Sequence, residues 1–305
     1  MSRRNAGRDI DGLLLLDKSP GLSSNGAVQR AKRLFQANKV GHTGSLDPIA
    51  TGLLPLCFGE AAKLAGFLLN NDKRYLVRMR LGKTTSTADT EGEVLEERSI
   101  PMLTREQVES HLDRFRGDIF QVPPMFSALK HQGRKLYELA RKGIEVERKP
   151  RAVRVHELSL LEIGESHLDL DVHCSKGAYI RSLAVDLGEA LGCGAHVERL
   201  RRTEVGVFKL EQAFTLEQLE GMSDEARQNL LIPLVEMAVE LPLVELAPEI
   251  AFHARRGQAV FVPNAPTSGL LKLVVRNGGF LGVGEVLEDG RIAPRRLVKE
   301  SRGLH

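Results

Sequence analysis

Cysteine is scarce in this sequence, which has only Cys57, Cys174 and Cys193 among its 305 residues. An odd set of three cannot form a complete disulfide framework, and its wide spacing lacks the close pairs that bind zinc. We therefore expect reduced and mostly buried thiols in a cytoplasmic protein, with no metal site.

Long apolar runs are also missing. The run Leu13–Leu16 is too short for the hydrophobic part of a signal peptide or for a membrane span. The hydrophobic and charged fractions, 42% and 27%, are those of an ordinary globular protein. The length suits one large domain, or a larger domain followed by a smaller one.

The net charge of +3 is small but unevenly distributed. Residues 128–154 carry nine Lys or Arg against three Glu, whereas residues 211–249 carry nine acidic groups against Arg227 alone. A polyanion such as RNA would be attracted to the first region and repelled by the second. Solvated protein faces have the same pattern, so the charges alone leave both interpretations open.

Helical and strand periodicities alternate irregularly along the chain, which predicts an α+β fold with a mixed sheet. One face of the segment 73–81 would carry Tyr75, Val77, Met79 and Leu81, as in a half-buried strand. The other predicted strands cover 13–16 and 168–174. The predicted helices begin at Ser23 or Ser24, cover 60–69, and extend from about 179 to 191.

Residues 120–154 have the character of an insertion between core elements. Pro123-Pro124 interrupts regular structure at its start, and Gly133 and Gly143 bracket a short predicted helix. The apolar strip of that helix would be Leu136 and Ala140, with basic residues on another face. Such an element could move as a unit and become ordered on RNA.

The pattern changes after about Pro242. Short predicted strands at 244–246, 259–262, 270–275 and 281–287 are separated by Pro and Gly, and Asn277-Gly278-Gly279 is typical of a hairpin. This predicts a small all-β module, which resembles the RNA-binding PUA domain. The predicted division is a domain of residues 1–243, with its insertion at 120–154, and a second domain of residues 244–305.

The segment from Gly41 to Gly52, GHTGSLDPIATG, cannot be an ordinary helix or a central strand. Its glycines permit unusual backbone angles, and Pro48 keeps Asp47 out of the helical region. Such a loop can hold a carboxylate at a fixed angle, as a nucleophile or general base requires. Asp before Pro is also common in simple turns, so the loop alone does not decide between these interpretations.

This loop resembles the signature Gly-His-Thr-Gly-x-Leu-Asp-Pro of the bacterial TruB family of pseudouridine synthases, which modify the T-arm of tRNA. All seven fixed positions match. The resemblance continues in Asp17-Lys18-Ser19-Pro20-Gly21, in Lys73-Arg74-Tyr75 and in the segment from Lys176 to Leu183. Ala178 departs from the family, where Thr is frequent. The resemblance implies a mixed, largely antiparallel sheet with an inserted thumb and a C-terminal PUA-like domain.

The resemblance also implies the catalytic residues. Asp47 would be the nucleophile, attacking either C1′ of the ribose or C6 of the uracil. Arg181 would keep Asp47 ionised and oriented. Tyr75 would stack on the uridine after it leaves the helix, and could accept the C5 proton.

Four further residues would contact the substrate or support the loop. Tyr179 would contact the base, and Leu200 would close the apolar side of the pocket. His42 would enter the RNA loop and occupy the space left by the extruded bases. Lys18 would support the catalytic loop or touch a phosphate. Considered without the family, Tyr75 and Leu200 are more typical of core residues. The same holds less strongly for Tyr179, because a glycine precedes it closely.

The implied reaction converts uridine to pseudouridine at position 55 of tRNA and requires no cofactor or metal. We expect a monomer that binds tRNA directly, without guide RNA or membrane, and with tRNA folding as a possible second role. One alternative is a non-catalytic RNA-binding or RNA-folding protein, although Asp47, Tyr75 and Arg181 are all present. The others are a guide-RNA-dependent relative and, more remotely, an Asp-dependent phosphatase or glycosidase.

Overall fold

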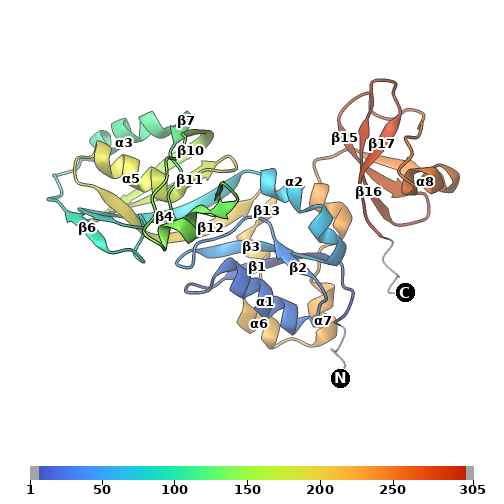
Figure 1. Ribbon diagram of the computed structural model, residues 1–305, viewed down its shortest axis with the longest axis horizontal. Helices are drawn as coiled ribbons and strands as arrows, with labels where there is room; N and C mark the ends of the chain where they lie inside the picture. The colour runs from blue at the N-terminus through green and yellow to red at the C-terminus, as the bar shows by residue number, and fades with distance from the viewer. Residues whose placement is uncertain (1–6, 300–305) are drawn as a thin grey trace.

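The computed structural model describes residues 7–299 and is built around two large β-sheets (Figure 1). Within these residues the larger sheet has nine strands in the order β1-β3-β12-β4-β11-β10-β7, with β2 beside β3 and β13 beside β12. Every pairing is antiparallel except β3 with β12, which confirms the predicted mixed, largely antiparallel sheet. The strands are β1 (Gly12–Lys18), β2 (Val40–His42), β3 (Thr51–Phe58), β4 (Lys73–Leu81), β7 (Gly117–Gln121), β10 (Arg151–Ile163), β11 (His167–Cys174), β12 (Ala195–Val205) and β13 (Phe208–Lys209).

The central strand β4 has the alternation expected from the sequence. Tyr75, Val77 and Met79 are buried in the main core, while Arg74 and Arg78 lie on the opposite face. There the arginines pair across the ladder with Asp171 and Asp169 of β11. An antiparallel sheet can expose one face to water, and these ion pairs make that face polar.

Helices α1 (Ser24–Leu34) and α5 (Ile180–Ala190) contribute apolar residues to the same main core. Of the two serines expected at the start of α1, Ser23 is the cap and accepts a hydrogen bond from the Gly26 backbone N–H. The predicted helix 60–69 is instead a 3-10 turn, Gly59–Lys63, followed by α2 (Ala65–Asn70). The two elements meet at Leu64, which is the C-cap of the first and the N-cap of the second.

The remaining elements of this part of the chain are three longer helices together with several short strands, helices and 3-10 turns. They are α1 (Ser24–Leu34), β5 (Lys83–Thr85), β6 (Val94–Glu97), α3 (Arg105–Leu112), the 3-10 turns Asp113–Phe115, Leu210–Gln212 and Leu234–Ala238, α5 (Ile180–Ala190), α6 (Leu216–Glu220) and α7 (Asp224–Asn229). All three cysteines are buried free thiols. No helix within residues 7–299 is long and apolar enough to cross a membrane.

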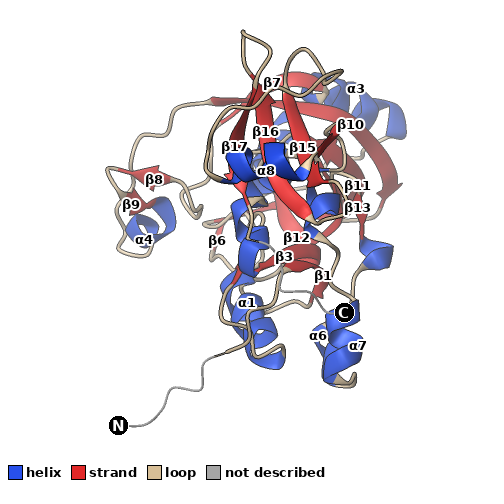
Figure 2. Cartoon of the chain, turned by 90° about the vertical axis from the view of Figure 1, so that its right-hand side faces the viewer, coloured by secondary structure: helices blue, strands red, loops and turns tan. Residues whose placement is uncertain are grey.

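A basic arm lies between β7 and β10 and projects from the main sheet (Figure 2). It contains β8 (Lys130–His131), β9 (Arg134–Lys135) and α4 (Leu136–Ala140). The buried residues of α4 are Leu136 and Leu139, so the predicted strip of Leu136 with Ala140 was wrong by one position. The helix has only about one turn, and residues three apart face the same side of it.

A four-stranded sheet forms the C-terminal region, in the order β14 (Leu243–Leu246), β15 (Leu270–Val275), β16 (Phe280–Val286) and β17 (Ile292–Leu297). The strand predicted at 259–262 was wrong, because only an isolated bridge joins Val260 to Ile292. Helix α8 (Pro248–Arg255) was not predicted. Pro248 at its first position was the available signal, since proline is favoured there.

The C-terminal sheet packs against the main body. Val283 of β16 shares a buried apolar cluster with Leu13 and Cys57, and Lys63 Nζ donates to the Leu297 carbonyl at 3.1 Å. The Lys299 N–H also donates to Glu60 at 2.7 Å. Residues 1–6 and 300–305, at the ends of the two predicted domains, lie outside the described residues.

Candidate active site

Asp47 lies in the loop between β2 and β3, and Ser24 of α1 anchors the residue before it. The Ser24 hydroxyl accepts from the Leu46 N–H at 2.7 Å and donates to the Leu46 carbonyl at 3.0 Å. The Ala50 N–H donates to the Asp47 carbonyl at 3.0 Å, which closes the turn. These bonds fix the backbone on both sides of the carboxylate.

Arg202 of β12 braces the same loop. It is 1% exposed, and its Nε and Nη2 donate to the carbonyls of Leu53 (2.7 Å) and Gly44 (3.2 Å). Gly52 has a φ of +98°, and a Cβ there would lie 2.3 Å from the Arg202 carbonyl oxygen. Glycine at 52 therefore permits β12 to approach the loop closely. Sequence reasoning missed Arg202, whose only signal was its place two residues after the candidate Leu200.

Arg181, the second residue of α5, forms a two-point ion pair with Asp47. Its Nε lies 2.9 Å from Asp47 Oδ2, and its Nη2 donates to Oδ1 at 3.1 Å. The arginine side chain is 5% exposed, whereas about a third of the aspartate side chain, 36%, remains exposed. The carboxylate is thus oriented from within the protein and remains open to a substrate.

The remaining Arg181 contacts come from two other segments. Its Nη1 donates to the Thr87 carbonyl at 3.1 Å, and its Nη2 donates to the Phe126 carbonyl at 2.7 Å. Asp89 Oδ2 lies 3.7 Å from Nη1. Sequence reasoning missed Asp89, which is 2% exposed, because its Ser-, Thr- and Gly-rich surroundings indicate only a turn.

Burial raises the pKa of Asp47 above its ordinary value, and this effect outweighs the opposing field of Arg181. The negative charge of Asp89 raises the pKa of Asp47 further, while Lys18 lowers it. Arg181 and Lys18 thus favour the ionised carboxylate, and burial with Asp89 favours the protonated acid.

Lys18 is fully buried at the end of β1. Its Nζ donates to the carbonyls of Ser19 (3.0 Å), Leu22 (2.7 Å) and Pro48 (3.2 Å). It therefore holds the residue that follows Asp47 and is not placed to meet a phosphate. Burial lowers the pKa of Lys18 to about 8, although the charges of Asp47 and Glu91 oppose that shift.

Both candidate tyrosines lie within the electrostatic field of Asp47. Tyr75 of β4 stands opposite Arg202 in the ladder and is 9% exposed. Tyr179 immediately precedes α5 and is only partly buried. Burial raises the pKa of each phenol, and the charge of Asp47 adds to both shifts.

Leu200 lies on β12, and His42 is the last residue of β2. Leu200 is 7% exposed and lines a groove of about 570 Å³ together with Ile49, two residues after Asp47, and Thr51, the first residue of β3. His42 lies on β2, where burial and then Arg202 lower its pKa. Its Nδ1 is buried without a hydrogen-bond partner among the described residues.

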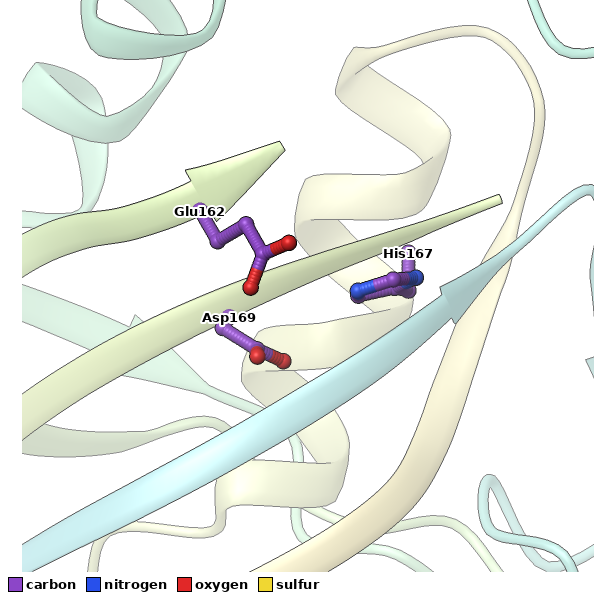
Figure 3. Close-up of side chains that lie close together, drawn as sticks. All are labelled: Glu162, His167 and Asp169. Carbon is purple, nitrogen blue, oxygen red and sulfur yellow. The ribbon is translucent and has the colours of Figure 1, made fainter. Parts of the chain in front are cut away.

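A separate group of possible metal ligands lies on the hairpin of β10 and β11, where Glu162, His167 and Asp169 place ligand atoms within 4.8 Å of one another (Figure 3). Both Asp169 oxygens accept hydrogen bonds from Arg78, at 2.7 and 2.6 Å. A metal ion would have to compete with this guanidinium, so we assign none to the group.

Family models match three consecutive stretches of the chain. Residues 32–180 match the "TruB family pseudouridylate synthase (N terminal domain)" and residues 181–240 the "tRNA pseudouridylate synthase B C-terminal domain". Residues 242–298 match "Pseudouridine synthase II TruB, C-terminal".

Curated proteins named tRNA pseudouridine synthase B are similar over nearly the whole chain. The protein from Nitrosococcus oceani is 54% identical and covers 99% of both chains. Those from Coxiella burnetii and Yersinia pestis are 53% and 49% identical, over 96% and 98% of this chain and 96% and 95% of their own lengths.

Solved structures of a more distant relative share the fold. The Cbf5-Nop10-Gar1 complex matches with a TM-score of 0.72 at 25% identity, over 95% of this chain and 84% of that one. The archaeal box H/ACA Nop10-Cbf5 complex matches with a TM-score of 0.71 at 22% identity, over 95% and 86%. Given the extent and identity of the curated matches, the chain belongs to the TruB family of pseudouridylate synthases and is an enzyme that isomerises uridine to pseudouridine.

Proposed function

We propose that this protein is a tRNA pseudouridine synthase that modifies the T-loop uridine at position 55, with Asp47 as its nucleophile. The observation that carries the proposal is the ion pair between Asp47 and the buried Arg181, at 2.9 Å, in the signature loop of the family. About half of the sequence is identical to that of curated tRNA pseudouridine synthases.

The reaction rearranges one nucleoside and needs no external reagent. The C1′–N1 bond breaks, the uracil turns, and a C1′–C5 bond forms, while C5 loses a proton and N1 gains one. Asp47 attacks either C1′ or C6, and both routes require its ionised form. Arg181 directs the carboxylate and favours its charged form, whereas burial favours the protonated acid.

The surrounding side chains would hold the detached base. Tyr75 stacks on the uracil and is a candidate acceptor of the C5 proton, and Tyr179 contacts the base from the start of α5. Leu200 closes the apolar side of the pocket, and His42 fills the space left in the RNA loop. Extruding a base costs a few kcal/mol, which contacts elsewhere on the tRNA must offset.

Two regions are suited to provide those contacts. The arm within residues 120–154 has a local excess of positive charge, and Figure 2 shows it projecting from the body. Residues 244–305 would form a PUA-like domain beside the catalytic domain of residues 1–243. Together they would grip the T-arm and the acceptor side, largely through phosphate contacts.

We further propose that the enzyme acts as a monomer in the cytoplasm and without guide RNA. The Cbf5 structures belong to box H/ACA assemblies, but they are only 22–25% identical to this chain. A guide-dependent enzyme would need additional components, whereas this enzyme should modify bare tRNA. A second activity in tRNA folding is compatible with the same binding surfaces.

The test is pseudouridine formation in an unmodified tRNA transcript, with the wild-type protein and the Asp47→Asn variant and no cofactor. Product at position 55 with the wild type alone would support both the substrate and the nucleophile. If a folded, tRNA-binding wild type forms no product, the stand-alone reaction is wrong. If the variant retains full activity, Asp47 is not the nucleophile.

A further inference from the structure

The strand that enters the basic arm ends at Gln121, and this buried side chain pairs with the backbone of Tyr179. The Tyr179 N–H donates to Gln121 Oε1 at 2.9 Å, and Gln121 Nε2 donates to the Tyr179 carbonyl at 3.2 Å. Gln121 is 2% exposed. An amide that pairs in this way fixes both the position and the rotation of the facing peptide.

The residues that follow Gln121 continue this attachment along the start of α5. Ser182 Oγ donates to the Val122 carbonyl at 2.8 Å, and Arg181 Nη2 donates to the Phe126 carbonyl at 2.7 Å. Residues 179, 181 and 182 are therefore all bonded to the segment 121–126, which we call the arm root.

The arm root is irregular for a reason that is visible in its sequence. Pro123 and Pro124 have no N–H and cannot continue the ladder of β7. Their neighbours' carbonyl groups must find other donors, since buried carbonyl groups are rarely left unpaired. Side chains provide these donors. Arg148 donates to the Pro123 carbonyl at 3.1 Å, and Ser182 and Arg181 donate to the carbonyls of Val122 and Phe126.

On the basis of the proposed function, we infer that Gln121 is a positioning residue for the isomerisation: it sets Tyr179 and Arg181 against Asp47 and links them to the basic arm. No side-chain cap holds the backbone at the start of α5, because Tyr179 is its N-terminal boundary and provides no capping bond. Gln121, at the end of strand β7, supplies that constraint. A displacement of the arm root moves the guanidinium that orients the nucleophile.

The first test compares Gln121→Ala with wild type in single-turnover pseudouridine formation and in tRNA binding. The expected loss in the chemical step is roughly 100-fold, because a displacement of about 1 Å can cost that much. The tRNA dissociation constant should change less than threefold. An unchanged rate, or a loss of rate that follows a loss of affinity, would overturn the inference.

The second test uses Gln121→Glu and remains informative if the alanine variant does not fold. A protonated carboxylic acid offers one acceptor and one donor, as the glutamine does, whereas the ionised form has no donor for the Tyr179 carbonyl. Burial should raise the pKa of the new carboxyl. The rate of this variant relative to wild type should therefore rise as the pH falls from 8 to 5.5.

Gln29→Glu is the matched control, since Gln29 is exposed on α1. The rate of this variant relative to wild type should not depend on pH. A pH-independent ratio for Gln121→Glu would mean that the donor to Tyr179 is irrelevant, and the inference would be wrong. Failure of the wild type to modify tRNA would instead refute the proposed function.

Discussion

Arg181 and Asp47 are 134 residues apart in sequence, yet two guanidinium nitrogens of Arg181 meet both carboxylate oxygens of Asp47, at 2.9 and 3.1 Å. The carboxylate is partly exposed and the guanidinium is buried. This asymmetry would keep the cation out of the substrate's path while its field acts on Asp47, the proposed nucleophile. The remaining Arg181 contacts, to Thr87, Phe126 and Asp89, leave little freedom to reorient.

Replacing Arg181 by Met should lower the chemical step by roughly 10²–10³-fold, the usual effect of removing one preorganised electrostatic group. The acid limb of the pH–rate profile should also move to higher pH, because Arg181 lowers the pKa of Asp47. Single-turnover rates from pH 5 to 9 would test both. Arg78→Met is the control, since Arg78 makes a similar pair with Asp169 on the opposite sheet face. An acid limb that stays in place would contradict the assigned role of Arg181.

Asp89→Asn should shift the acid limb in the opposite direction. The negative charge of Asp89 raises the pKa of Asp47, so its removal should let Asp47 ionise at lower pH. The maximal rate should fall as well, because Asp89 helps to hold Arg181. A shift of the limb to higher pH would show that Asp89 acts mainly by orienting Arg181.

Lys18→Met should change the pH dependence of stability. The pKa of Lys18 is lowered from 10.5 to about 8, so between these values the unfolded chain retains a proton that the folded protein has lost. The stability contribution of wild-type Lys18 should therefore rise with pH across this window, by on the order of 3 kcal/mol over its full width. Urea unfolding of both proteins at pH 7.5 and 9.5 would measure it. If the free energy of unfolding depended on pH equally in the two proteins, the lowered pKa of Lys18 would be excluded.

Gly52→Ala should destabilise the fold by about 3 kcal/mol or more. The new methyl group would lie 2.3 Å from the Arg202 carbonyl oxygen, and the residue would keep a φ of +98°. Gly21→Ala is the matched control, because Gly21 also has a positive φ, +75°, but open space around its Cβ position. That variant should cost about 1 kcal/mol from backbone strain alone. Similar losses of free energy of unfolding in both variants would argue against the close approach of β12.

Replacing Lys130, Arg134 and Arg141 by Ala should weaken tRNA binding with little effect on the chemical step. The slope of log affinity against log salt should decrease by about one for each phosphate contact that is lost. Fluorescence titrations of tRNA binding from 50 to 200 mM salt would measure both the affinity and this slope. Unchanged affinity and slope would exclude the arm as an RNA contact.

Local sequence patterns determined much of this structure. Glycines and Pro48 predicted an irregular loop around Asp47, and the alternation from Lys73 to Leu81 gave β4 with its observed bounds. Ser23, one of the two serines expected to cap the helix that follows, is its cap. Each of these features depends on backbone preferences or on side-chain periodicity within a few residues, which a sequence displays directly.

Short elements were harder to predict for the same reason. Helix α8 has only eight residues and the predicted strand at 259–262 is a single bridge. In such segments few positions are available to distinguish one periodicity from another, and packing against neighbouring strands decides the outcome.

Only the tertiary structure decided which groups surround the carboxylate. The sequence identified Asp47 and, through the family resemblance, Arg181. It did not show that Asp89 lies beside Arg181, that Arg202 braces the loop before Asp47, or that Gln121 holds the Tyr179 backbone. These residues come from separate segments, and the order β3-β12-β4 together with the position of α5 brings them to one place. Hydrogen bonds between such distant residues depend on sheet order and on buried polar groups finding partners, neither of which leaves a local pattern in the sequence.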